Sequence, residues 1–329
     1  MEHIPVRAAT DAEVAFFQEH GWVRLARLVD PGTVAILRER AIRHLEARSR
    51  ARASLVDQAF GQSRDIADSD ELFGLLTMSQ TMGANAIRLL RGVTAVRVQV
   101  TNLLIKEPAV QHDSPAVTPH DPARFTPSMA APQDTGEGES GRLSPPMAAA
   151  RDTGEGDSAH DSGQLNPSAT ASPDTGEAAP DIGHGSTEFH QDFPWMPMDR
   201  SAMLTVWLAL VDVPADMGSL RFYSGSHRHG LLGRSFTRQG DDQLTQHPWL
   251  KDLELSPPLD LKAGDATVHH ALTVHGAPAN HRDTPRLSFT VTYFDADSLY
   301  TGTPYRQTDG LGLKVNEPFD HERFPCLGP

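Results

Sequence analysis

The stretch Leu204-Thr205-Val206-Trp207-Leu208-Ala209-Leu210-Val211-Asp212-Val213 opens the series of apolar segments that decides the fold. Its length and its β-branched and aromatic residues are typical of a buried strand. Further strands are predicted at residues 219–223, 266–270 and 287–294, separated by turns such as Asp216-Met217-Gly218. No helix-length pattern alternates with these strands, which disfavours a parallel doubly wound sheet. We therefore expect an antiparallel double-sheet jelly roll, mainly β in class.

Helical patterns dominate the first third of the chain. A capped amphipathic helix is predicted at residues 11–20, with Val14, Phe16 and Phe17 on its apolar side, and a short strand follows at 22–25. Two more helices are expected at residues 31–47 and 71–90, and a strand is expected at residues 95–100. The jelly roll should therefore carry flanking helices contributed by the amino-terminal part.

Residues 109–185 differ sharply in composition from the rest of the chain. This segment of 77 residues is rich in Pro, Gly, Ala, Ser, Thr and Asp, and Phe125 is its only aromatic residue. It contains twelve acidic residues and three arginines, so it holds most of the net negative charge. Such a composition cannot bury enough apolar surface to offset the entropy of ordering the chain. We predict a single domain formed by residues 1–108 and 186–329, interrupted by a low-complexity, disordered insert at 109–185.

The insert repeats the tetrapeptide Asp-Thr-Gly-Glu at residues 134–137, 152–155 and 174–177. Asp-Thr-Gly is also the active-site triplet of aspartic proteases, whose chemistry needs two carboxylates sharing a proton in a dry cleft. The residues that precede the triplets here are Ala-Pro-Gln, Ala-Ala-Arg and Ala-Ser-Pro, which do not form apolar strands. Unequal spacing also argues against a solenoid. We therefore reject both a protease and a solenoid.

Charge and targeting signals restrict the classes of partner. The chain of 329 residues has 29 basic and 43 acidic residues and a formal net charge of −14, which disfavours nucleic acid and anionic membranes. The amino terminus lacks a secretory leader pattern, and no stretch approaches the roughly 18 apolar residues of a membrane span. A lone Cys326 excludes an internal disulfide and a multi-cysteine metal site. We expect a cytoplasmic protein, a monomer or weak dimer, whose partner is a small-molecule substrate.

A possible metal motif lies just after the insert, in Glu188-Phe189-His190-Gln191-Asp192-Phe193-Pro194-Trp195. Residues two apart on an extended segment project to the same side, so His190 and Asp192 can reach one ion. Two imidazoles and one carboxylate are the set that holds non-haem Fe(II) and leaves positions open for oxygen chemistry. A second His-x-Asp, at residues 281–283, lies in a polar turn next to a proline and is predicted to be a solvated loop.

The third ligand must come from another strand. His275 ends the segment 263–275, in which a turn leads into a strand, and the adjacent His269 and His270 are its rivals. Arg286 favours His275, because it begins the next apolar strand and should lie beside the end of the preceding one. An arginine fork at that place can bind a distal carboxylate in bidentate fashion.

These residues together resemble the phytanoyl-CoA dioxygenase family of Fe(II)/2-oxoglutarate oxygenases. The resemblance covers about residues 16–294 apart from the insert, and it rests on an ordered series of motifs: His190-Gln191-Asp192, Trp207, Gly218-Ser219-Leu220-Arg221-Phe222, Ser224-Gly225-Ser226-His227, Gly264-Asp265, His275-Gly276, Asn280 and Arg286. It implies a double-stranded β-helix of cupin-like type. It also implies iron held by His190, Asp192 and His275, with 2-oxoglutarate chelating the iron and meeting Arg286.

The resemblance extends to cosubstrate contacts and to the reaction. Lys106 matches a family lysine that can contact the cosubstrate, the alternative being an exposed lysine at a strand end. Many members have a polar residue where this chain has Ala277, and Ser288 is a candidate replacement. The family reaction consumes O2 and 2-oxoglutarate and releases succinate and CO2. Because Asp192 is present, whereas related halogenases lack the carboxylate, hydroxylation is the expected outcome, with desaturation or ring formation possible on the same centre.

The substrate cannot be named from these residues. The candidate pocket residues are the apolar side chains next to the motif and on a neighbouring strand: Phe193, Trp195, Met196, Met198 and Phe222. The chain shows no basic cluster suited to a CoA phosphate, which favours a free small molecule or biosynthetic intermediate. Two alternatives remain, namely a cupin-type metal protein with non-oxidative chemistry and a scaffold protein with a vestigial iron site.

Overall fold

The computed structural model describes residues 4–51, 60–109, 185–234 and 243–328, and the predicted insert lies almost entirely outside them. The α-helices of the described chain are α1 (Asp11–His20), α2 (Pro31–Ala51), α3 (Ile66–Ser69), α4 (Glu71–Thr77), α5 (Gln80–Leu90) and α6 (Gln243–Gln246). Its strands are β1 (Trp22–Leu25), β2 (Phe60–Arg64), β3 (Val96–Lys106), β4 (Thr187–His190), β5 (Met203–Ala209), β6 (Arg221–Phe222), β7 (Ala266–His270), β8 (His275–Ala277), β9 (Arg286–Asp295) and β10 (Cys326–Leu327). Short 3-10 helices occur at Phe193–Trp195, Ala215–Met217, Ser226–His229 and Pro248–Asp252.

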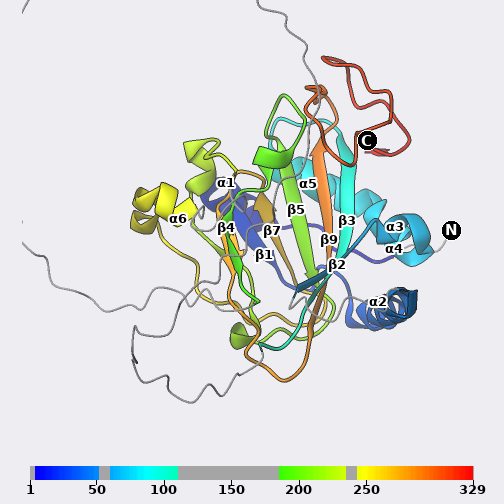
Figure 1. Cartoon of the computed structure of the whole chain (residues 1–329), viewed down its shortest axis with the longest axis vertical. Helices are drawn as coiled ribbons and strands as arrows, with labels where there is room; N and C mark the ends of the chain where they lie inside the picture. The colour runs from blue at the N-terminus through cyan, green and yellow to red at the C-terminus, as the bar shows by residue number, and fades with distance from the viewer. Residues whose placement is uncertain (1–3, 52–59, 110–184, 235–242, 329) are drawn as a thin grey trace, which may run out of the picture. The chain divides into compact units, whose positions relative to one another are not determined.

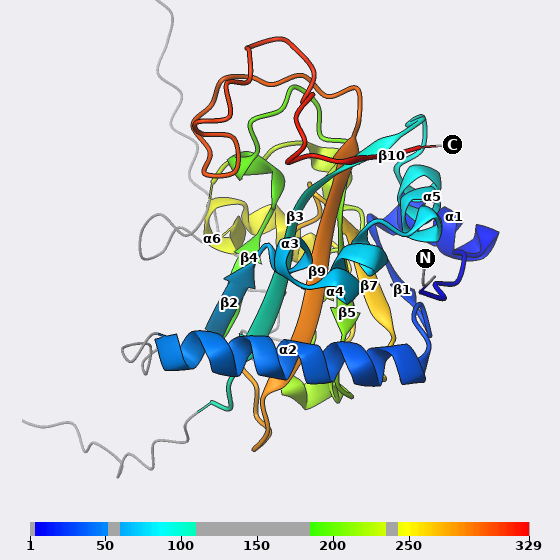
Figure 2. The same ribbon diagram turned by 90° about the vertical axis from the view of Figure 1, so that its right-hand side faces the viewer.

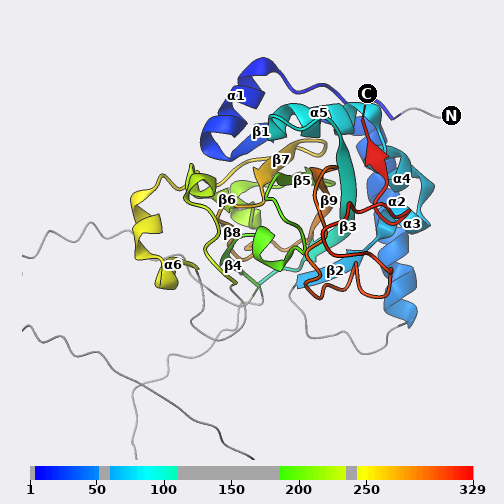
Figure 3. The same ribbon diagram turned by 90° about the horizontal axis from the view of Figure 1, so that it is seen from above.

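The strands form two antiparallel sheets (Figure 1). The larger sheet has the order β1-β7-β5-β9-β3-β10, with β2 also paired to β3, and the smaller sheet has the order β4-β8-β6. The small sheet lies across from β7, β5 and β9 in the view of Figure 3. This arrangement confirms the predicted mainly β jelly roll with flanking helices.

The two faces of the large sheet differ in chemistry because side chains alternate along each strand. On β9, Leu287, Phe289 and Val291 belong to the main hydrophobic core, and the ring of Phe289 lies 4.8 Å from that of Phe73 on α4. Helices α2, α3, α4 and α5 cover this face (Figure 2). The opposite face carries polar residues at alternate positions, and it is this face that builds the site.

Several element boundaries differ from the sequence prediction. The helix expected at 71–90 is divided into α4 and α5, because Ser79 adopts an extended backbone and serves as the N-cap of α5. Strand β3 runs to Lys106, beyond the predicted end at residue 100, because β9 pairs with it as far as Arg286 opposite Lys106. Pairing with a neighbouring strand decides a strand's length, which local composition alone does not reveal.

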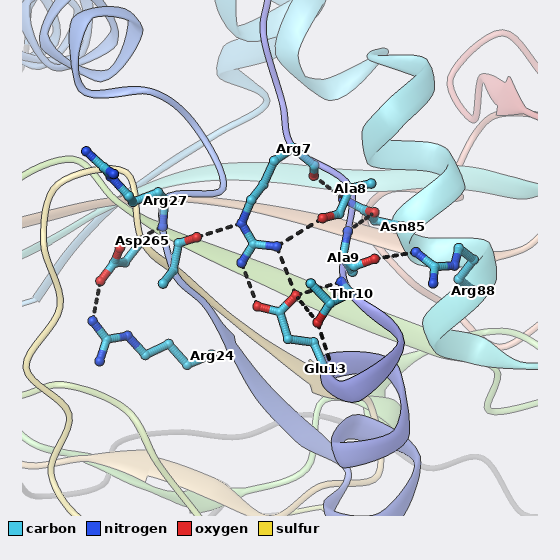
Figure 4. Close-up of polar contacts among 11 residues, drawn as sticks. Arg7, Ala8, Ala9, Thr10, Glu13, Arg24, Arg27, Asn85, Arg88 and Asp265 are labelled. Carbon is cyan, nitrogen blue, oxygen red and sulfur yellow. Dashed lines mark hydrogen bonds and ion pairs between the residues drawn. The ribbon is translucent and has the colours of Figure 1, made fainter.

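The amino-terminal helix α1 is capped, as the sequence predicted, and the cap is a capping box. The Thr10 side chain accepts a hydrogen bond from the Glu13 backbone N–H, and Glu13 in turn accepts from the Thr10 backbone. Arg7 pairs with the Glu13 carboxylate at 2.6 Å (Figure 4). Phe17 is buried in the core, whereas Phe16 remains 38% exposed, so only part of the predicted apolar side is covered.

The pair Gly264-Asp265 ties β1 to β7. The Asp265 carboxylate is buried and accepts from the Arg24 side chain at 2.6 Å and from the Arg27 backbone N–H at 2.8 Å (Figure 4). Gly264 has a φ of +97°, and a Cβ at this position would lie 2.3 Å from the Val29 carbonyl oxygen. Both residues of this motif are therefore required by the turn itself.

Among the residues in the four described ranges, no helix has the length and apolar character that crossing a membrane requires. The second His-x-Asp motif lies in an exposed turn at residues 281–283, as expected, where Arg282 pairs with Asp216 at 2.6 Å.

Candidate functional site

Three side chains converge between β4, β8 and the segment that follows β4. Strand β4 pairs with β8 so that His190 lies opposite His275, and their ring centroids are 4.3 Å apart. Asp192 Oδ1 lies 3.6 Å from His190 Nε2 and 3.8 Å from His275 Nε2. One ligand atom from each of these residues lies within 4.8 Å of the other two. This is a spacing at which two imidazoles and a carboxylate can hold one metal ion.

Gly276 permits the close approach of the two strands that carry the histidines. A Cβ at Gly276 would lie 2.8 Å from the Thr187 carbonyl oxygen and 3.2 Å from the Phe189 ring. A side chain there would push β8 away from β4. The glycine after His275 therefore contributes to the geometry of the site through packing.

Backbone carbonyls orient both imidazoles. His190 Nδ1 lies 2.8 Å from the Glu188 carbonyl oxygen, and His275 Nδ1 lies 3.0 Å from the Thr273 carbonyl oxygen. A carbonyl can only accept, so in each ring Nδ1 carries the proton and Nε2 holds the lone pair. The same Nε2 atoms face Asp192, which is the orientation that metal ligation requires.

The carboxylate of Asp192 is anchored through its other oxygen. Asp192 Oδ2 accepts from the Thr205 hydroxyl at 3.0 Å and from His269 Nε2 at 3.2 Å. Thr205 is itself 3.1 Å from the Thr292 hydroxyl on β9. Because Oδ2 is occupied by these donors, Oδ1 is the oxygen left to face the two histidines.

Gln191, between the two ligand candidates, fixes the segment in place. Its amide nitrogen donates to the carbonyl oxygens of Gly230 at 2.9 Å and Leu272 at 2.7 Å, and its amide oxygen accepts from the Leu232 backbone N–H at 2.8 Å. The middle residue of the motif is therefore a structural brace that points away from the metal position.

The electrostatics keep the triad in the form that binds a cation. Burial raises the pKa of Asp192, but the neighbouring His275, His190 and His269 outweigh it and hold the pKa well below its usual range. Burial lowers the pKa of His275 well below its usual range, and His269 and His190 reinforce that effect. An ionised carboxylate and a neutral imidazole are the protonation states of metal ligands.

The two rivals of His275 have other roles in the structure. His269 is only 2% exposed and touches Asp192 rather than completing the triad. His270 points to the other side of β7, where its Nδ1 accepts from the Leu272 backbone N–H and its ring lies 5.7 Å from that of His227. The choice of His275 over both neighbours agrees with this placement.

We expect His269→Leu to lower the affinity of the site for Mn²⁺ by about 10- to 100-fold, the usual effect of losing a partner that orients a metal ligand. Leucine fills a similar volume but cannot donate to Asp192. His269→Gln, which retains a donor, should recover part of the affinity, and His270→Leu should have little effect. Calorimetric titration of each metal-free variant with Mn²⁺ measures these affinities. Equal losses in His269→Leu and His270→Leu would contradict the assigned role.

The triad opens onto a cavity of about 630 Å³ between the two sheets. Its walls come mainly from the polar face of the large sheet, from the residues around the triad and from the chain near residue 305. The lining residues are Arg64, Gln99, Val100, Asn102, Leu104, Ser186, Thr187, His190, Asp192, Trp195, Met196, Met203, Thr205, Trp207, Leu220, His269, His275, Arg286, Thr290, Thr292, Tyr305 and Gln307.

Arg286 lines this cavity as a buried cation. It is 1% exposed, its guanidinium lies 5.1 Å above the Trp207 ring, and Nη1 donates to the Gly218 carbonyl oxygen. Within the described ranges, Nε has no hydrogen-bond partner and no acidic side chain forms an ion pair with the group. Burial lowers its pKa to about 10, so it remains charged at neutral pH. A buried, uncompensated guanidinium is suited to bind an anion.

Lys106 and Ser288 lie next to Arg286 but do not line the cavity. Lys106 is fully buried rather than exposed, and its Nζ donates to the carbonyl oxygens of Pro278 at 2.8 Å and Ala277 at 3.3 Å. Burial, followed by the charge of Arg286, lowers the pKa of Lys106 to about 7. Ser288 follows Arg286 on the same strand face, and its buried hydroxyl has no partner in the described chain.

Of the five apolar candidates for the substrate pocket, two line the cavity, and Phe193, Met198 and Phe222 do not. Trp195 and Met196 line the cavity. Phe193 packs instead against the cluster that contains Met198, and Phe222 is buried, with its ring stacked 4.9 Å from that of Trp22.

Sequence reasoning missed the polar residues of the inner face. Thr205, Thr290 and Thr292 occupy every second position of buried strands, and all three line the cavity. This alternation of hydroxyls with large apolar residues was the available signal, because a polar side chain on a buried strand usually faces a ligand, water or another polar group. Tyr305 and Gln307 follow the last β-rich segment and gave no such pattern.

A jelly roll with two histidines and one carboxylate on its inner strands defines the class of non-haem metal proteins. Residues 170–288 match the family model for phytanoyl-CoA dioxygenase (PhyH), which confirms the resemblance seen in the sequence. Phytanoyl-CoA dioxygenase 1 of Oryza sativa subsp. japonica is 30% identical over 118 residues, and phytanoyl-CoA dioxygenase domain-containing protein 1 of Mus musculus is 31% identical over 121 residues. The matches span 42% and 40% of those proteins and 36% and 34% of this chain.

Solved structures share the fold over nearly the whole chain. The non-haem α-ketoglutarate-dependent carbocyclase SnoK from nogalamycin biosynthesis has a TM-score of 0.62 at 22% identity, covering 97% of this chain and 96% of its own. The epimerase SnoN, solved with Fe³⁺, α-ketoglutarate and a nogalamycin, has a TM-score of 0.60 at 22% identity, with coverages of 96% and 97%. EctD from S. alaskensis with bound Fe has a TM-score of 0.54 at 15% identity, with coverages of 91% and 84%. At these identities the comparisons establish the fold.

Proposed function

We propose that this protein is an Fe(II)- and 2-oxoglutarate-dependent dioxygenase that hydroxylates an unactivated C–H bond of a small molecule, releasing succinate and CO2. One observation carries the proposal, namely that the metal triad and the uncompensated Arg286 line the same cavity. His190, Asp192 and His275 would hold the iron. Arg286 would bind the distal carboxylate of 2-oxoglutarate.

The residues present fit both groups. The triad supplies two neutral imidazole Nε2 atoms and one carboxylate oxygen, which is the donor set of non-haem Fe(II) sites with open positions. Arg286 is a buried cation that has no acidic partner among the described residues, and a carboxylate of the cosubstrate would satisfy it. A protein that bound the metal but not 2-oxoglutarate would not need a buried cation facing the cavity.

When bound, iron and 2-oxoglutarate supply oxygen activation coupled to oxidative decarboxylation. The chain's contribution is to position these groups and to exclude water. Thr205 and His269 hold the Asp192 carboxylate in one orientation, and the Trp207 ring covers one face of the Arg286 guanidinium. Because Thr205, His269 and Trp207 are almost fully buried, the charged groups beside them act in a partly low-dielectric environment in which their interactions are stronger than in water.

The substrate is proposed to be a free small molecule or a biosynthetic intermediate. Within the described chain, the cations that line the cavity are Arg64 and Arg286, with no basic cluster for the phosphates of CoA. Structural neighbours from nogalamycin biosynthesis act as a carbocyclase and an epimerase, so ring formation or epimerisation on the same centre is the second candidate outcome.

The test is anaerobic addition of Fe(II) and 2-oxoglutarate to the metal-free protein. Chelation of iron by 2-oxoglutarate should give a visible absorption band that requires both components. His190→Ala should abolish the band. A cupin-type protein with non-oxidative chemistry, or a scaffold with a vestigial site, would bind metal or nothing and give no band with 2-oxoglutarate. Succinate formation in a substrate screen then distinguishes the possible substrates.

A further inference from the structure

The cavity extends beyond the metal triad on the side opposite Arg286. Along β5, Trp207 lies under Arg286, Thr205 touches Asp192, and Met203 comes next on the same face. We call the part of the cavity around Tyr305 the distal end; it is lined by Arg64, Gln99, Trp195, Met196, Tyr305 and Gln307. Arg64 lies on β2 opposite Asn102 of β3, at the level of Thr290 and Trp207, and is near enough to Tyr305 to lower its pKa.

The polar groups of the distal end include both donors and acceptors, and the buried Gln99 amide oxygen has no hydrogen-bond partner among the described residues. The Gln99 amide nitrogen donates to the Tyr305 hydroxyl oxygen at 3.0 Å, which leaves the Tyr305 O–H free to donate to a ligand. Burial raises the pKa of Tyr305, and although Arg64 is near enough to lower it, the hydroxyl stays protonated. Arg64 is exposed, and its side chain forms neither an ion pair nor a hydrogen bond with the described residues.

Gln307 adds an unsatisfied amide to the same place. It is 7% exposed, and its amide oxygen has no hydrogen-bond partner in the described chain. Leaving a buried polar group unpaired costs about 1 to 3 kcal/mol, so a ligand hydroxyl or amine is the natural partner. Asp192, a candidate metal ligand, is the one acidic residue among the described residues that line the cavity. The distal end itself is lined by no carboxylate in the described chain, although Asp192 and Asp65 are near enough to Tyr305 to raise its pKa.

The remaining wall of the distal end is apolar. Trp195 and Met196 line it, and Arg234 lies 4.8 Å above the Trp195 ring, which holds the indole in place. A flat hydrocarbon or aromatic skeleton can pack against such a surface. With about 630 Å³ in all, the cavity has room for 2-oxoglutarate and a second small molecule.

The polar residues at the two ends of the cavity come from different parts of the chain, whereas Trp195 and Met196 at the distal end lie inside the matched region. The triad and Arg286 lie inside residues 170–288, which match the family model, whereas Arg64, Gln99, Tyr305 and Gln307 lie outside it. This division separates the chemistry shared with relatives from the residues that are available to select a substrate.

We propose that the distal end binds a substrate with a flat apolar skeleton that carries an anionic oxygen, held by Arg64 and Tyr305, next to a hydroxyl that donates to Gln307. A hydroxy-substituted aromatic or enolic carboxylate has this chemistry. The proposal rests on the proposed function, because it assumes that 2-oxoglutarate occupies the Arg286 end. The reactive C–H then faces the metal while the charged group is held away from it.

The test uses probes rather than the unknown substrate. The full-length protein, loaded anaerobically with Mn²⁺ and 2-oxoglutarate, is titrated calorimetrically with 3-hydroxy-2-naphthoate, its carboxamide and 2-naphthoate, and with salicylate and salicylamide. Each carboxylate should bind about three- to tenfold more tightly than its carboxamide, as expected for a partly exposed charge-assisted pair. 2-Naphthoate, which lacks the hydroxyl, should bind more weakly than 3-hydroxy-2-naphthoate.

Variants assign the preference to named residues. Arg64→Gln should abolish the preference for the carboxylate, Arg64→Lys should retain most of it, and Tyr305→Phe should reduce it a fewfold. Arg306→Gln is the matched control, because it removes the same charge from an exposed neighbour that does not line the cavity. The affinity for 2-oxoglutarate, measured separately, should be unchanged in all four variants.

The outcomes separate this proposal from the proposed function. Carboxamides that bind as well as carboxylates, no detectable binding of any probe, or a preference that survives Arg64→Gln would overturn the distal-end assignment even if the 2-oxoglutarate band forms. Loss of the 2-oxoglutarate band in the wild-type protein would instead overturn the proposed function.

Discussion

The His275→Ala variant is expected to lose metal binding almost completely, with an affinity for Fe(II) or Mn²⁺ lowered by more than about 100-fold. Loss of a group that merely orients a ligand already costs about 10- to 100-fold, and His275 supplies one of the three ligand atoms themselves. His190→Ala and Asp192→Ala should behave alike. The fold should persist, because the main hydrophobic core lies on the other face of the large sheet.

Metal content after anaerobic reconstitution, together with the far-ultraviolet circular dichroism of each variant, measures this effect. His270→Ala is the control, since the His270 ring lies near His227 and away from the triad. If His275→Ala retained iron and activity while His270→Ala lost both, the distal ligand would have been assigned to the wrong histidine.

The second large effect is expected for Arg286→Met, which should weaken 2-oxoglutarate binding by about 2 to 3 kcal/mol, the strength of a charge-assisted pair in a buried site. Methionine fills part of the space over the Trp207 ring without a charge. The sharper expectation concerns selectivity. The wild-type protein should prefer 2-oxoglutarate to 2-oxobutyrate, which has the same 2-oxo acid group but no distal carboxylate. The Arg286→Met variant should bind the two compounds equally.

Selectivity between the two keto acids is measured by titrating Fe(II)-loaded protein anaerobically and following the visible band. This ratio does not depend on any general loss of stability, which matters because Arg286 also contacts Gly218 and Trp207. A variant that still prefers 2-oxoglutarate would show that another cation, with Lys106 the nearest candidate, receives the distal carboxylate.

The candidate triad could be predicted without side-chain coordinates, because the two-residue periodicity of strands indicated which side chains share a face. His190 and Asp192 are two residues apart on an extended segment, and pairing of β4 with β8 brings His190 opposite His275. Arg286 lies on β9 of the other sheet, so its place in the same cavity comes from the packing of the two sheets. The same periodicity predicted the fold class. It could not predict the lengths of β3 and β9, which depend on each other through pairing.

The sequence by itself determined the class of fold, the three residues of the candidate metal triad and the unusual composition of residues 109–185, because periodicity, residue type and composition are local properties. Only the tertiary structure decided the roles that depend on burial. It turned Lys106 away from the cavity and toward backbone carbonyls, placed His269 on the Asp192 carboxylate, and brought Arg64 and Tyr305 to one end of the cavity. These residues are far apart in sequence, and nothing in their neighbours specifies which strands will pack against them.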